Sequence, residues 1–204
     1  MEPVLHLVDD EEAVRRSAEL LLVASGHRVI TYPGAQPLLA AAGPTGTGLA
    51  PGCLILDVRM PGMDGLQLME ELSRRGSPLP VVMVTGHGDV PLAVRAMRAG
   101  AVDFLEKPYT EERLLEAVAA ALAQGGEAAQ RRAEVARAGA QVAGLSPRER
   151  EVLACLVQGM ANKVVAHQLG ISPRTVEVHR ANLMEKLGAK SLPDLVKIGL
   201  AAGM

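Results

Sequence analysis

Five short apolar runs divide the first half of the chain, and this alternation constrains the fold more than any other feature. The runs occupy residues 4–8, 27–32, 53–57, 81–85 and 102–106. Three of them are continuously apolar, which is typical of strands buried on both faces of a sheet. Helix-like segments follow at about 11–25, 34–42, 64–75, 89–99 and 110–123. Because neighbouring parallel strands need a crossover helix, the pattern predicts an α/β fold with a doubly wound, five-stranded parallel sheet.

The composition changes after the fifth helix-like segment, where a linker is expected. Residues 124–144 are mainly alanine and charged residues. They predict either a helix interrupted at Gly125-Gly126 or a flexible tether. An earlier stretch, residues 40–52, is rich in glycine and proline. It predicts a long, mobile loop within the first domain, residues 1–123.

Residues 145–204 predict a second domain, a small all-α domain of four short helices. Three of these helices have a serine at the expected start: Ser146 and Ser172, each followed by proline, and Ser191. A serine side chain can accept a hydrogen bond from the first turn of a helix, and proline fits the first helical position. The spacing over residues 161–188 is that of a helix-turn-helix, whose second helix enters the major groove of DNA.

The charge is distributed unevenly between the two domains. Residues 1–122 carry 10 basic and 16 acidic residues, whereas residues 145–204 carry 8 basic and 5 acidic residues. This asymmetry indicates two modules with different partners, and the basic excess of the second permits nucleic-acid binding. No apolar run approaches the ~18 residues of a membrane span. With two cysteines in apolar segments and no signal-peptide pattern at the N-terminus, we expect a cytoplasmic protein without a membrane partner.

Polar residues follow four of the apolar runs at the point where each predicted strand ends. Asp9 and Asp10 follow the first run, Asp57 ends the third, Thr85 ends the fourth and Lys107 comes just after the fifth. In an open parallel sheet these positions lie on the carboxyl edge, where ligand sites form. Each residue alone would be read as a solvated loop residue. Their convergence on one edge favours a site.

The chemistry of this set points to a cation and a phosphoryl group. Three carboxylates close together raise each other's pKa values unless a cation lies among them. Ligands that are all oxygen suit Mg²⁺ rather than zinc. One carboxylate could act as a nucleophile towards phosphorus and form an aspartyl phosphate. The metal and a lysine would then offset charge on the phosphoryl oxygens, to which a hydroxyl would also donate.

The segments "LVDDEE", "LILDVRMPGMDG", "VVMVTGHGDV" and "DFLEKPY" together resemble the receiver domain of two-component response regulators, over about residues 3–123. The resemblance implies a flavodoxin-like fold in which Asp57 accepts a phosphoryl group from a sensor histidine kinase. It also implies a Mg²⁺ site in which Asp10 binds directly, Asp9 binds through water, and Asp57 and the backbone carbonyl of Arg59 complete the protein ligands.

The same resemblance implies a switch. Thr85 and Lys107 would contact the phosphoryl group, and Phe104 would rotate inward when Thr85 moves. We expect the face formed by Val90, Val94 and Phe104 to mediate dimerisation of the receiver. Asp64, in contrast, is better explained as a helix cap than as part of the chemistry.

The segment "LSPREREVLACLVQGMANKVVAHQLGISPRTVEVHRANLMEKLG" resembles the DNA-binding domain of the LuxR/NarL family. A helical wheel places Val176, Leu183 and Leu187 on the core face of its second helix. The residue types on the remaining surface suit base edges and phosphates, although a solvated helix face is the alternative. The candidate DNA contacts are Asn162, Lys163, Arg174, Thr175, Glu177, Val178, Asn182 and Lys186.

Taken together, the two halves resemble response regulators of the FixJ type. This resemblance implies a phosphorylation-activated transcription factor that binds promoter DNA as a homodimer, with RNA polymerase as a further candidate partner. It extends to nitrogen-fixation or oxygen-responsive target genes. No enzyme activity is expected beyond self-phosphorylation and autodephosphorylation of the receiver. Two departures from the family are the length of the 40–52 loop and the small basic excess.

Two other classes of function fit parts of the sequence. A phosphatase of the haloacid dehalogenase type would also use an aspartate nucleophile, but it typically shows Asp-x-Asp where this chain has Asp57-Val58-Arg59. A relay or protein-interaction regulator could have a helical domain that binds no DNA. Salt-dependent duplex binding distinguishes this third class from a transcription factor.

Overall fold

The computed structural model describes residues 2–86 and 90–204, with Val90 included only as backbone. The chain separates into two compact units, Met1–Ala129 and Gln130–Met204. We call them unit 1 and unit 2.

Unit 1 contains the parallel sheet that the apolar runs predict. Its strands are β1 (Val4–Val8), β2 (Arg28–Tyr32), β3 (Gly52–Asp57), β4 (Val81–Thr85) and β5 (Asp103–Glu106). All four neighbouring pairs are parallel, in the order β2-β1-β3-β4-β5. This is the flavodoxin-like order. The predicted fold class is confirmed, with strand ends that differ from the prediction by at most one residue.

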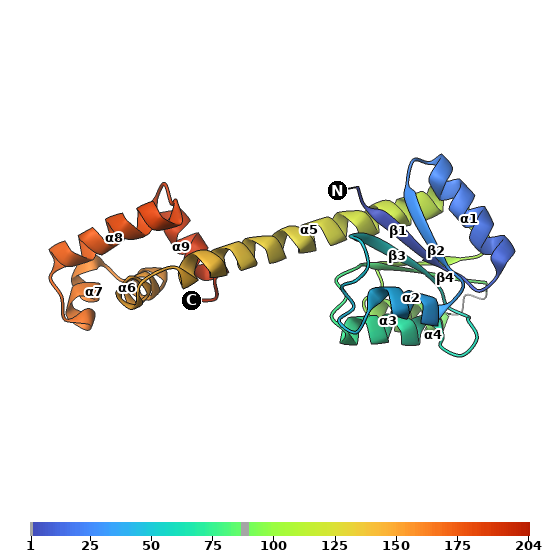
Figure 1. Ribbon diagram of the computed structural model, residues 1–204, viewed down its shortest axis with the longest axis horizontal. Coiled ribbons are helices and arrows are strands. Elements are labelled where there is room, and N and C mark those ends of the chain that lie inside the picture. The colour runs from blue at the N-terminus through green and yellow to red at the C-terminus, as the bar shows by residue number, and fades with distance from the viewer. Residues whose placement is uncertain (1, 87–89) are drawn as a thin grey trace. The chain divides into compact units, whose positions relative to one another are not determined.

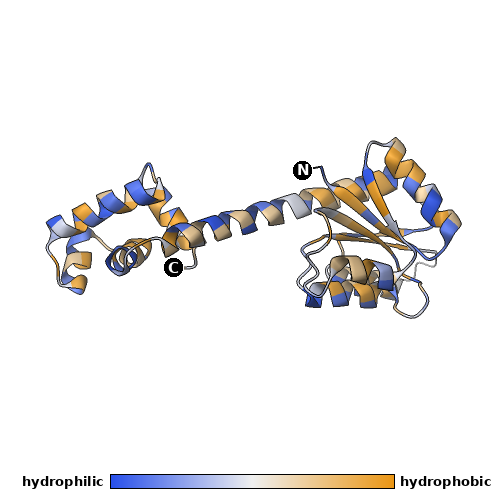
Figure 2. Cartoon of the chain, viewed as in Figure 1, coloured by the Kyte–Doolittle hydropathy of each residue, from blue (hydrophilic) through white to orange (hydrophobic). Residues whose placement is uncertain are grey.

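Helices cover both faces of the sheet (Figure 1). One face packs against α1 (Glu12–Ala24) and the first part of α5 (Glu111–Ala143), and the other packs against α2 (Ala35–Ala42), α3 (Gly65–Arg74) and α4 (Val90–Arg98). Side chains alternate between the faces along each strand, because a strand has a period of two. The strands of the sheet are accordingly largely apolar in Figure 2.

Helix α5 continues through both glycines of the expected linker. It runs unbroken over Glu111–Ala143, so the predicted interruption at Gly125-Gly126 is wrong. A Cβ at Gly125 would lie 3.1 Å from Cδ and Cγ of Pro80. Gly125 therefore permits a close approach to the β3–β4 side of unit 1, and the surrounding alanines favour the helix.

The long loop between α2 and β3 is held by hydrogen bonds, although its composition suggests a mobile segment. Gly48 N–H donates to the Ala42 carbonyl at 3.0 Å, and the His6 ring pairs with the Ala50 carbonyl at 3.0 Å. Arg75 Nη1 donates to the Gly43 carbonyl at 3.1 Å. Both ends of the loop are thus tied to the body of unit 1.

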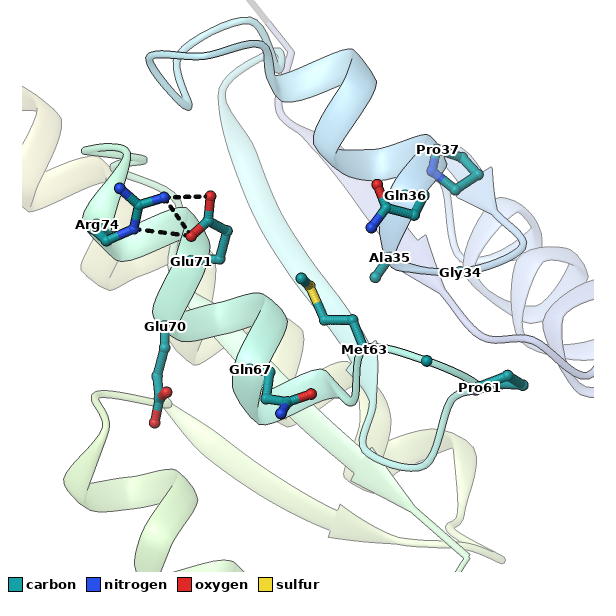
Figure 3. Close-up of a pocket in the computed structure, with 11 residues that line it drawn as sticks. Gly34, Ala35, Gln36, Pro37, Pro61, Met63, Gln67, Glu70, Glu71 and Arg74 are labelled. Carbon is teal, nitrogen blue, oxygen red and sulfur yellow. Dashed lines mark hydrogen bonds and ion pairs between the residues drawn. The ribbon is translucent and has the colours of Figure 1, made fainter.

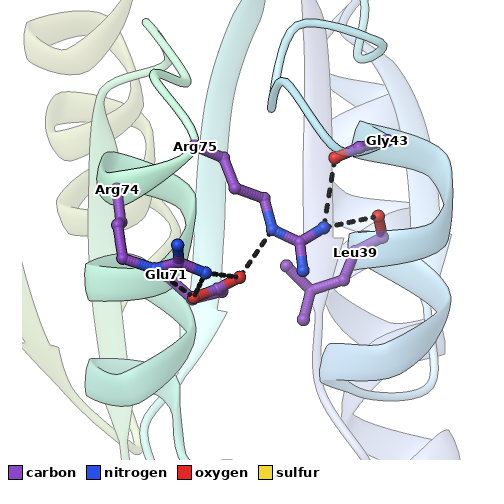
Figure 4. A network of polar contacts seen from close by, with 5 residues as sticks. All are labelled: Leu39, Gly43, Glu71, Arg74 and Arg75. Carbon is purple, nitrogen blue, oxygen red and sulfur yellow. Dashed lines mark hydrogen bonds and ion pairs between the residues drawn. The ribbon is translucent and has the colours of Figure 1, made fainter.

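Arg75 connects this loop to helix α3 (Figure 4). Its Nη1 also donates to the Leu39 carbonyl at 3.5 Å, and its Nε donates to Glu71 Oε1 at 2.6 Å. Arg74 binds the same Glu71 carboxylate at 2.7 Å. One carboxylate therefore orients the arginine that caps the C-terminal end of α2.

Unit 2 contains the four predicted helices, three of which begin at a serine cap. They are α6 (Pro147–Val157), α7 (Asn162–Leu169), α8 (Pro173–Leu187) and α9 (Leu192–Ala201). Each predicted cap is confirmed by a hydrogen bond to the serine side chain: Ser146 accepts from Glu149 N–H, Ser172 from Thr175 N–H and Ser191 from Asp194 N–H. The helices enclose a separate core that includes Val152, Leu153, Val165, Val176, Leu183 and Leu187.

Among the residues described, no helix combines the length and the hydrophobicity that crossing a lipid bilayer requires.

Buried His6 makes the stability of unit 1 depend on pH. The Ala50 carbonyl can only accept, so His6 Nε2 carries the proton and Nδ1 accepts from the Tyr32 hydroxyl at 3.1 Å. Burial lowers the pKa of His6 below its ordinary 6.5, and the hydrogen bond to Ala50 offsets only part of this. Below pH 6.5 the unfolded chain therefore binds a proton that folded His6 does not bind.

The free energy of unfolding should therefore be undiminished above pH 6.5 and decrease below it, by at most about 1.4 kcal/mol per pH unit. Urea unfolding between about pH 5 and 8 measures this. Tyrosine fluorescence reports unit 1 alone, because the chain has no tryptophan and both of its tyrosines, Tyr32 and Tyr109, lie there. The variant His6→Gln lacks the titrating imidazole and should lose this pH dependence of the free energy of unfolding. If the free energies of unfolding of variant and wild type differed by the same amount at every pH, the expectation would be contradicted.

Candidate functional site

The carboxyl edge of the sheet gathers four of the predicted site residues. Asp9 follows β1 directly, Asp57 ends β3, Thr85 ends β4 and Lys107 follows β5. Asp9, Asp57 and Thr85 are buried, with exposed fractions of 3%, 6% and 0%. The direction of strand addition reverses between β1 and β3, and open α/β sheets form ligand sites at such a reversal.

Lys107 joins the two buried carboxylates. Its Nζ donates to Asp9 Oδ2 at 2.6 Å and to Asp57 Oδ1 at 2.7 Å. Its backbone N–H donates to the Thr85 carbonyl at 2.7 Å, which fixes the start of the side chain beside β4. The ammonium group thus sits between carboxylates that neighbouring strands bring to the same edge.

The electrostatics of this cluster are unbalanced. Burial raises the pKa of Asp57 above its ordinary value, and the charge of Asp9 adds to this, against the lowering effect of Lys107. Burial alone would lower the pKa of Lys107, but its hydrogen bonds to Asp57 and Asp9 outweigh that and raise the pKa. One ammonium offsets only one of two buried carboxylates, so the cluster retains a negative charge.

Three residues that the sequence did not single out also shape the site. Glu11 N–H donates to Asp9 Oδ1 at 2.9 Å, and Arg15 Nη1 donates to the Asp9 backbone carbonyl at 2.6 Å. Tyr109 lies two residues beyond Lys107, and burial raises the pKa of its hydroxyl. Glu11 was recognisable, because an aspartate often accepts from the N–H two residues on. Arg15 carried no local signal.

Gly65 allows helix α3 to begin directly against the end of β3. A Cβ at this position would lie 2.2 Å from the Asp57 carbonyl oxygen, so any larger residue would displace the strand end that carries Asp57. Asp64 caps the helix by accepting from Gln67 N–H at 2.8 Å, and Gln67 Oε1 accepts from Asp64 N–H in return at 3.1 Å. The predicted capping role of Asp64 is confirmed.

The side chains of Asp10 and Arg59 are exposed, and the Arg59 backbone forms a hydrogen bond with Asp57 that acts to lower the pKa of that carboxyl. Both border a shallow hollow of about 540 Å³, together with Pro61 and Leu92. Within residues 2–86 and 90–204, no three His, Cys, Asp or Glu side chains surround a common metal position. Direct binding of a metal by Asp10 would therefore require its side chain to turn towards Asp57.

The three residues of the predicted dimer face differ in their accessibility. Val94, on α4, is 42% exposed. Phe104, on β5, is half-buried against the core beneath α2, α3 and α4. The side chain of Val90 lies outside the described residues.

A larger hollow, of about 770 Å³, lies between α2 and α3 (Figure 3). Gln36 and Pro37 line it from α2, and Gln67 and Arg74 line it from α3. It contains none of Asp9, Asp57, Thr85 or Lys107, so its size does not identify the reactive centre.

Unit 2 presents most of the predicted DNA contacts on exposed surface. Arg174, Glu177 and Val178 border a shallow hollow on α8, and Val178 is 54% exposed. Asn182 on α8 and Lys163 on α7 are also exposed. This surface combines a guanidinium, an amide and an apolar side chain, which suit phosphates, base edges and thymine methyl groups.

The remaining three predicted contacts bind partners within unit 2. The Thr175 hydroxyl lies 2.8 Å from Ser172 Oγ. Asn162 Oδ1 accepts from Arg180 at 2.9 Å. Lys186 Nζ is paired with a Glu149 oxygen at 2.8 Å.

Each of the two units matches a known protein family. The family described as "Response regulator receiver domain" matches residues 5–119, and the family "Bacterial regulatory proteins, luxR family" matches residues 143–198. The transcriptional regulatory protein FixJ of Azorhizobium caulinodans is 50% identical over 200 residues, which cover 98% of this chain and 93% of that protein.

Solved structures show the same likeness. The response regulator StyR is 40% identical, with a TM-score of 0.82 over 97% of this chain and 98% of that one. Full-length FixJ from B. japonicum is 45% identical, with a TM-score of 0.60 over 100% of this chain and 98% of that one.

We expect opposite effects on stability from replacing the two ends of the Lys107–Asp57 pair. Because the pKa of Asp57 is raised in the folded state, its ionised form at pH 7 opposes folding. Asp57→Asn should therefore increase the free energy of unfolding of unit 1. Lys107→Met leaves two buried carboxylates without their cation and should decrease it by about 3 kcal/mol.

Urea unfolding at pH 7 with a metal chelator present, followed by tyrosine fluorescence, tests both signs. Glu70→Gln on the exposed side of α3 is a matched control for the loss of one carboxylate and should leave the stability unchanged. A less stable Asp57→Asn variant would show that Lys107 outweighs burial at this site.

Proposed function

This chain belongs to the two-component response regulators that combine a receiver domain with a luxR-family DNA-binding domain, and from this membership we propose that Asp57 is its phosphoacceptor. It is a transcriptional regulator rather than a classical enzyme. In this proposal residues 1–123 form the receiver, residues 124–144 the linker and residues 145–204 the DNA-binding domain. The observation that carries the proposal is the 2.7 Å contact between Asp57 and Lys107 at the carboxyl edge.

The phosphoryl donor is the phosphohistidine of a sensor histidine kinase. An Asp57 carboxylate oxygen attacks phosphorus, an O–P bond forms, and the N–P bond to the kinase imidazole breaks. Lys107 already contacts Asp57, and its ammonium offsets charge on the phosphoryl oxygens. Thr85, at the end of the neighbouring strand, donates a hydrogen bond from its hydroxyl to one of these oxygens.

The residues present fit Mg²⁺ as the cofactor. Asp9, Asp10 and Asp57 supply three carboxylates against one Lys107 ammonium, so a divalent cation would balance the charge. All the donors are oxygen atoms, including the Arg59 carbonyl, which suits a hard cation that keeps several waters. When bound, Mg²⁺ would neutralise phosphoryl oxygen charge. Asp9 would act through water, Asp57 and Asp10 directly.

Phosphorylation acts as a switch through charge. The group adds about −1.5 to −2 charge at Asp57. Thr85 and Lys107 move towards it, and Phe104 turns into the space that Thr85 leaves. The face that contains Val90, Val94 and Phe104 then pairs with the same face of a second chain. The exposed apolar side chain of Val94 supports a role in such an interface.

The dimer binds promoter DNA through α8 of each chain. Two recognition helices that engage two half-sites increase affinity without any new interaction within either chain. RNA polymerase is a further partner in this proposal, and the targets are nitrogen-fixation or oxygen-responsive genes. The protein acts in the cytoplasm. Chemistry of its own is confined to phosphorylation and dephosphorylation of Asp57.

Phosphorylation of the purified chain tests the first half of the proposal. Incubation with a small acyl phosphate and Mg²⁺ should label the wild-type chain, as measured on a phosphate-affinity gel. Asp57→Asn should remain unlabelled, and Glu70→Gln should be labelled like wild type. Labelling of Asp57→Asn at the wild-type level would place the phosphoacceptor elsewhere.

Duplex binding by the phosphorylated full-length chain tests the second half. The affinity should fall linearly with the logarithm of salt concentration, and Arg174→Met should reduce this slope by about 0.9 for each phosphate that Arg174 neutralises. Val178→Ala should change the preferred sequence and leave the slope unchanged, because an apolar side chain releases no counterions. Binding insensitive to salt would instead favour a protein-interaction regulator.

A further inference from the structure

Lys186 lies at the C-terminal end of the recognition helix. It is the fourteenth of the fifteen residues of α8, twelve residues beyond Arg174. At 1.5 Å per residue this places it about 18 Å along the helix axis from Arg174. Recognition helices contact bases mainly through their N-terminal residues. Contact with bases therefore does not explain the position of Lys186.

Glu149, on helix α6, binds Lys186 with both of its carboxylate oxygens. Lys186 Nζ lies 2.8 Å from Oε1 and 2.9 Å from Oε2. Glu149 is 4% exposed, whereas the Lys186 side chain is half-exposed. The ammonium group reaches back from the surface to a carboxylate that the domain has buried, and this ion pair leaves one cation fewer for phosphates.

The same Glu149 carboxylate also fixes the start of α6. Ser146 N–H donates to Glu149 Oε2 at 2.9 Å, and Ser146 Oγ accepts from Glu149 N–H at 3.3 Å. The hydrogen bond to Lys186 and those to Ser146 lower the pKa of Glu149 to about 2. The carboxylate is therefore ionised at neutral pH and can pair with the Lys186 ammonium.

The first turn of α6 also holds the other helix of the helix-turn-helix. Arg148, next to Glu149, donates through Nη2 to the Leu169 carbonyl at the end of α7. Arg148 thus caps α7 while Glu149 holds the end of α8. Both helices of the DNA-reading element are anchored to adjacent residues of one turn.

We propose that Lys186 is a positioning residue, which sets the angle of the recognition helix through Glu149 and makes no contact with DNA. The inference rests on the proposed DNA-binding function. A residue that binds phosphate contributes to the salt dependence of binding. A residue that orients the helix changes the affinity at every salt concentration equally. The two roles therefore differ in a measurable slope.

The test uses the phosphorylated full-length chain and a labelled duplex selected in vitro for binding to the wild type. Lys186→Met should weaken binding about tenfold with the wild-type salt slope, and Lys186→Arg should restore most of the affinity. Glu149→Gln should weaken binding as much, and the double variant should bind no more weakly than either single variant. Lys163→Met, at an exposed candidate phosphate contact, should instead lower the slope by about 0.9.

Lys190→Met is the matched control, because it removes an exposed cation outside the proposed contacts and should bind like wild type. Thermal melting of each full-length variant, followed by circular dichroism, establishes that it is folded at the assay temperature. A reduced slope for Lys186→Met, additive effects in the double variant, or effects that only follow the unfolded fraction would each overturn the positioning role. Failure of the wild-type chain to bind any duplex would overturn the DNA-binding function itself, and this inference with it.

Discussion

The ion pairs that the Lys107 ammonium makes with Asp9 and Asp57 are the interactions on which the rest of unit 1 depends. The parallel sheet brings two acidic strand ends together, because β1 and β3 are neighbours. Strand β5 is separated from β3 by β4, which is about 10 Å at the usual strand spacing. A side chain from β5 must be long to reach across this distance, and lysine carries a compact charge on a four-carbon stem.

The incomplete neutralisation of this cluster connects the fold to the proposed switch. A fully neutralised ion pair would carry no net charge, so it would bind a further cation or anion only weakly. Burial instead keeps the pKa of Asp57 raised while Lys107 is in place, so the site stores unfavourable charge in the folded state. Binding of Mg²⁺, and then transfer of a phosphoryl group, would relieve and redistribute that charge.

The sequence predicts the strands and the acidic edge well, because both follow from local patterns. Apolar runs locate the strands, and the carboxyl-edge rule then places Asp9, Asp57 and Lys107 together without knowledge of any contact. The same reasoning fails where a distant residue decides. Gly125-Gly126 looks like a helix break, yet Gly125 packs against Pro80 within a continuous helix.

The loop before β3 and Lys186 on α8 also show that local sequence patterns do not reveal contacts with distant residues. The glycines and prolines of the loop suggest mobility, but they do not reveal that Arg75 and His6, from elsewhere in unit 1, form hydrogen bonds with it. A helical wheel leaves Lys186 at the margin of the DNA-facing surface. It cannot reveal Glu149, which lies 37 residues away in the sequence.

The internal pairing of cations in unit 2 explains why this regulator would need two chains on DNA. Residues 145–204 carry 8 basic and 5 acidic residues. Arg148, Arg180 and Lys186 are each bonded to other parts of unit 2. Fewer cations therefore remain for phosphates than the composition indicates, and each phosphate contact contributes to affinity through counterion release. In the proposed mechanism a single domain would bind weakly, so a receiver that controlled dimerisation would also control occupancy of the promoter.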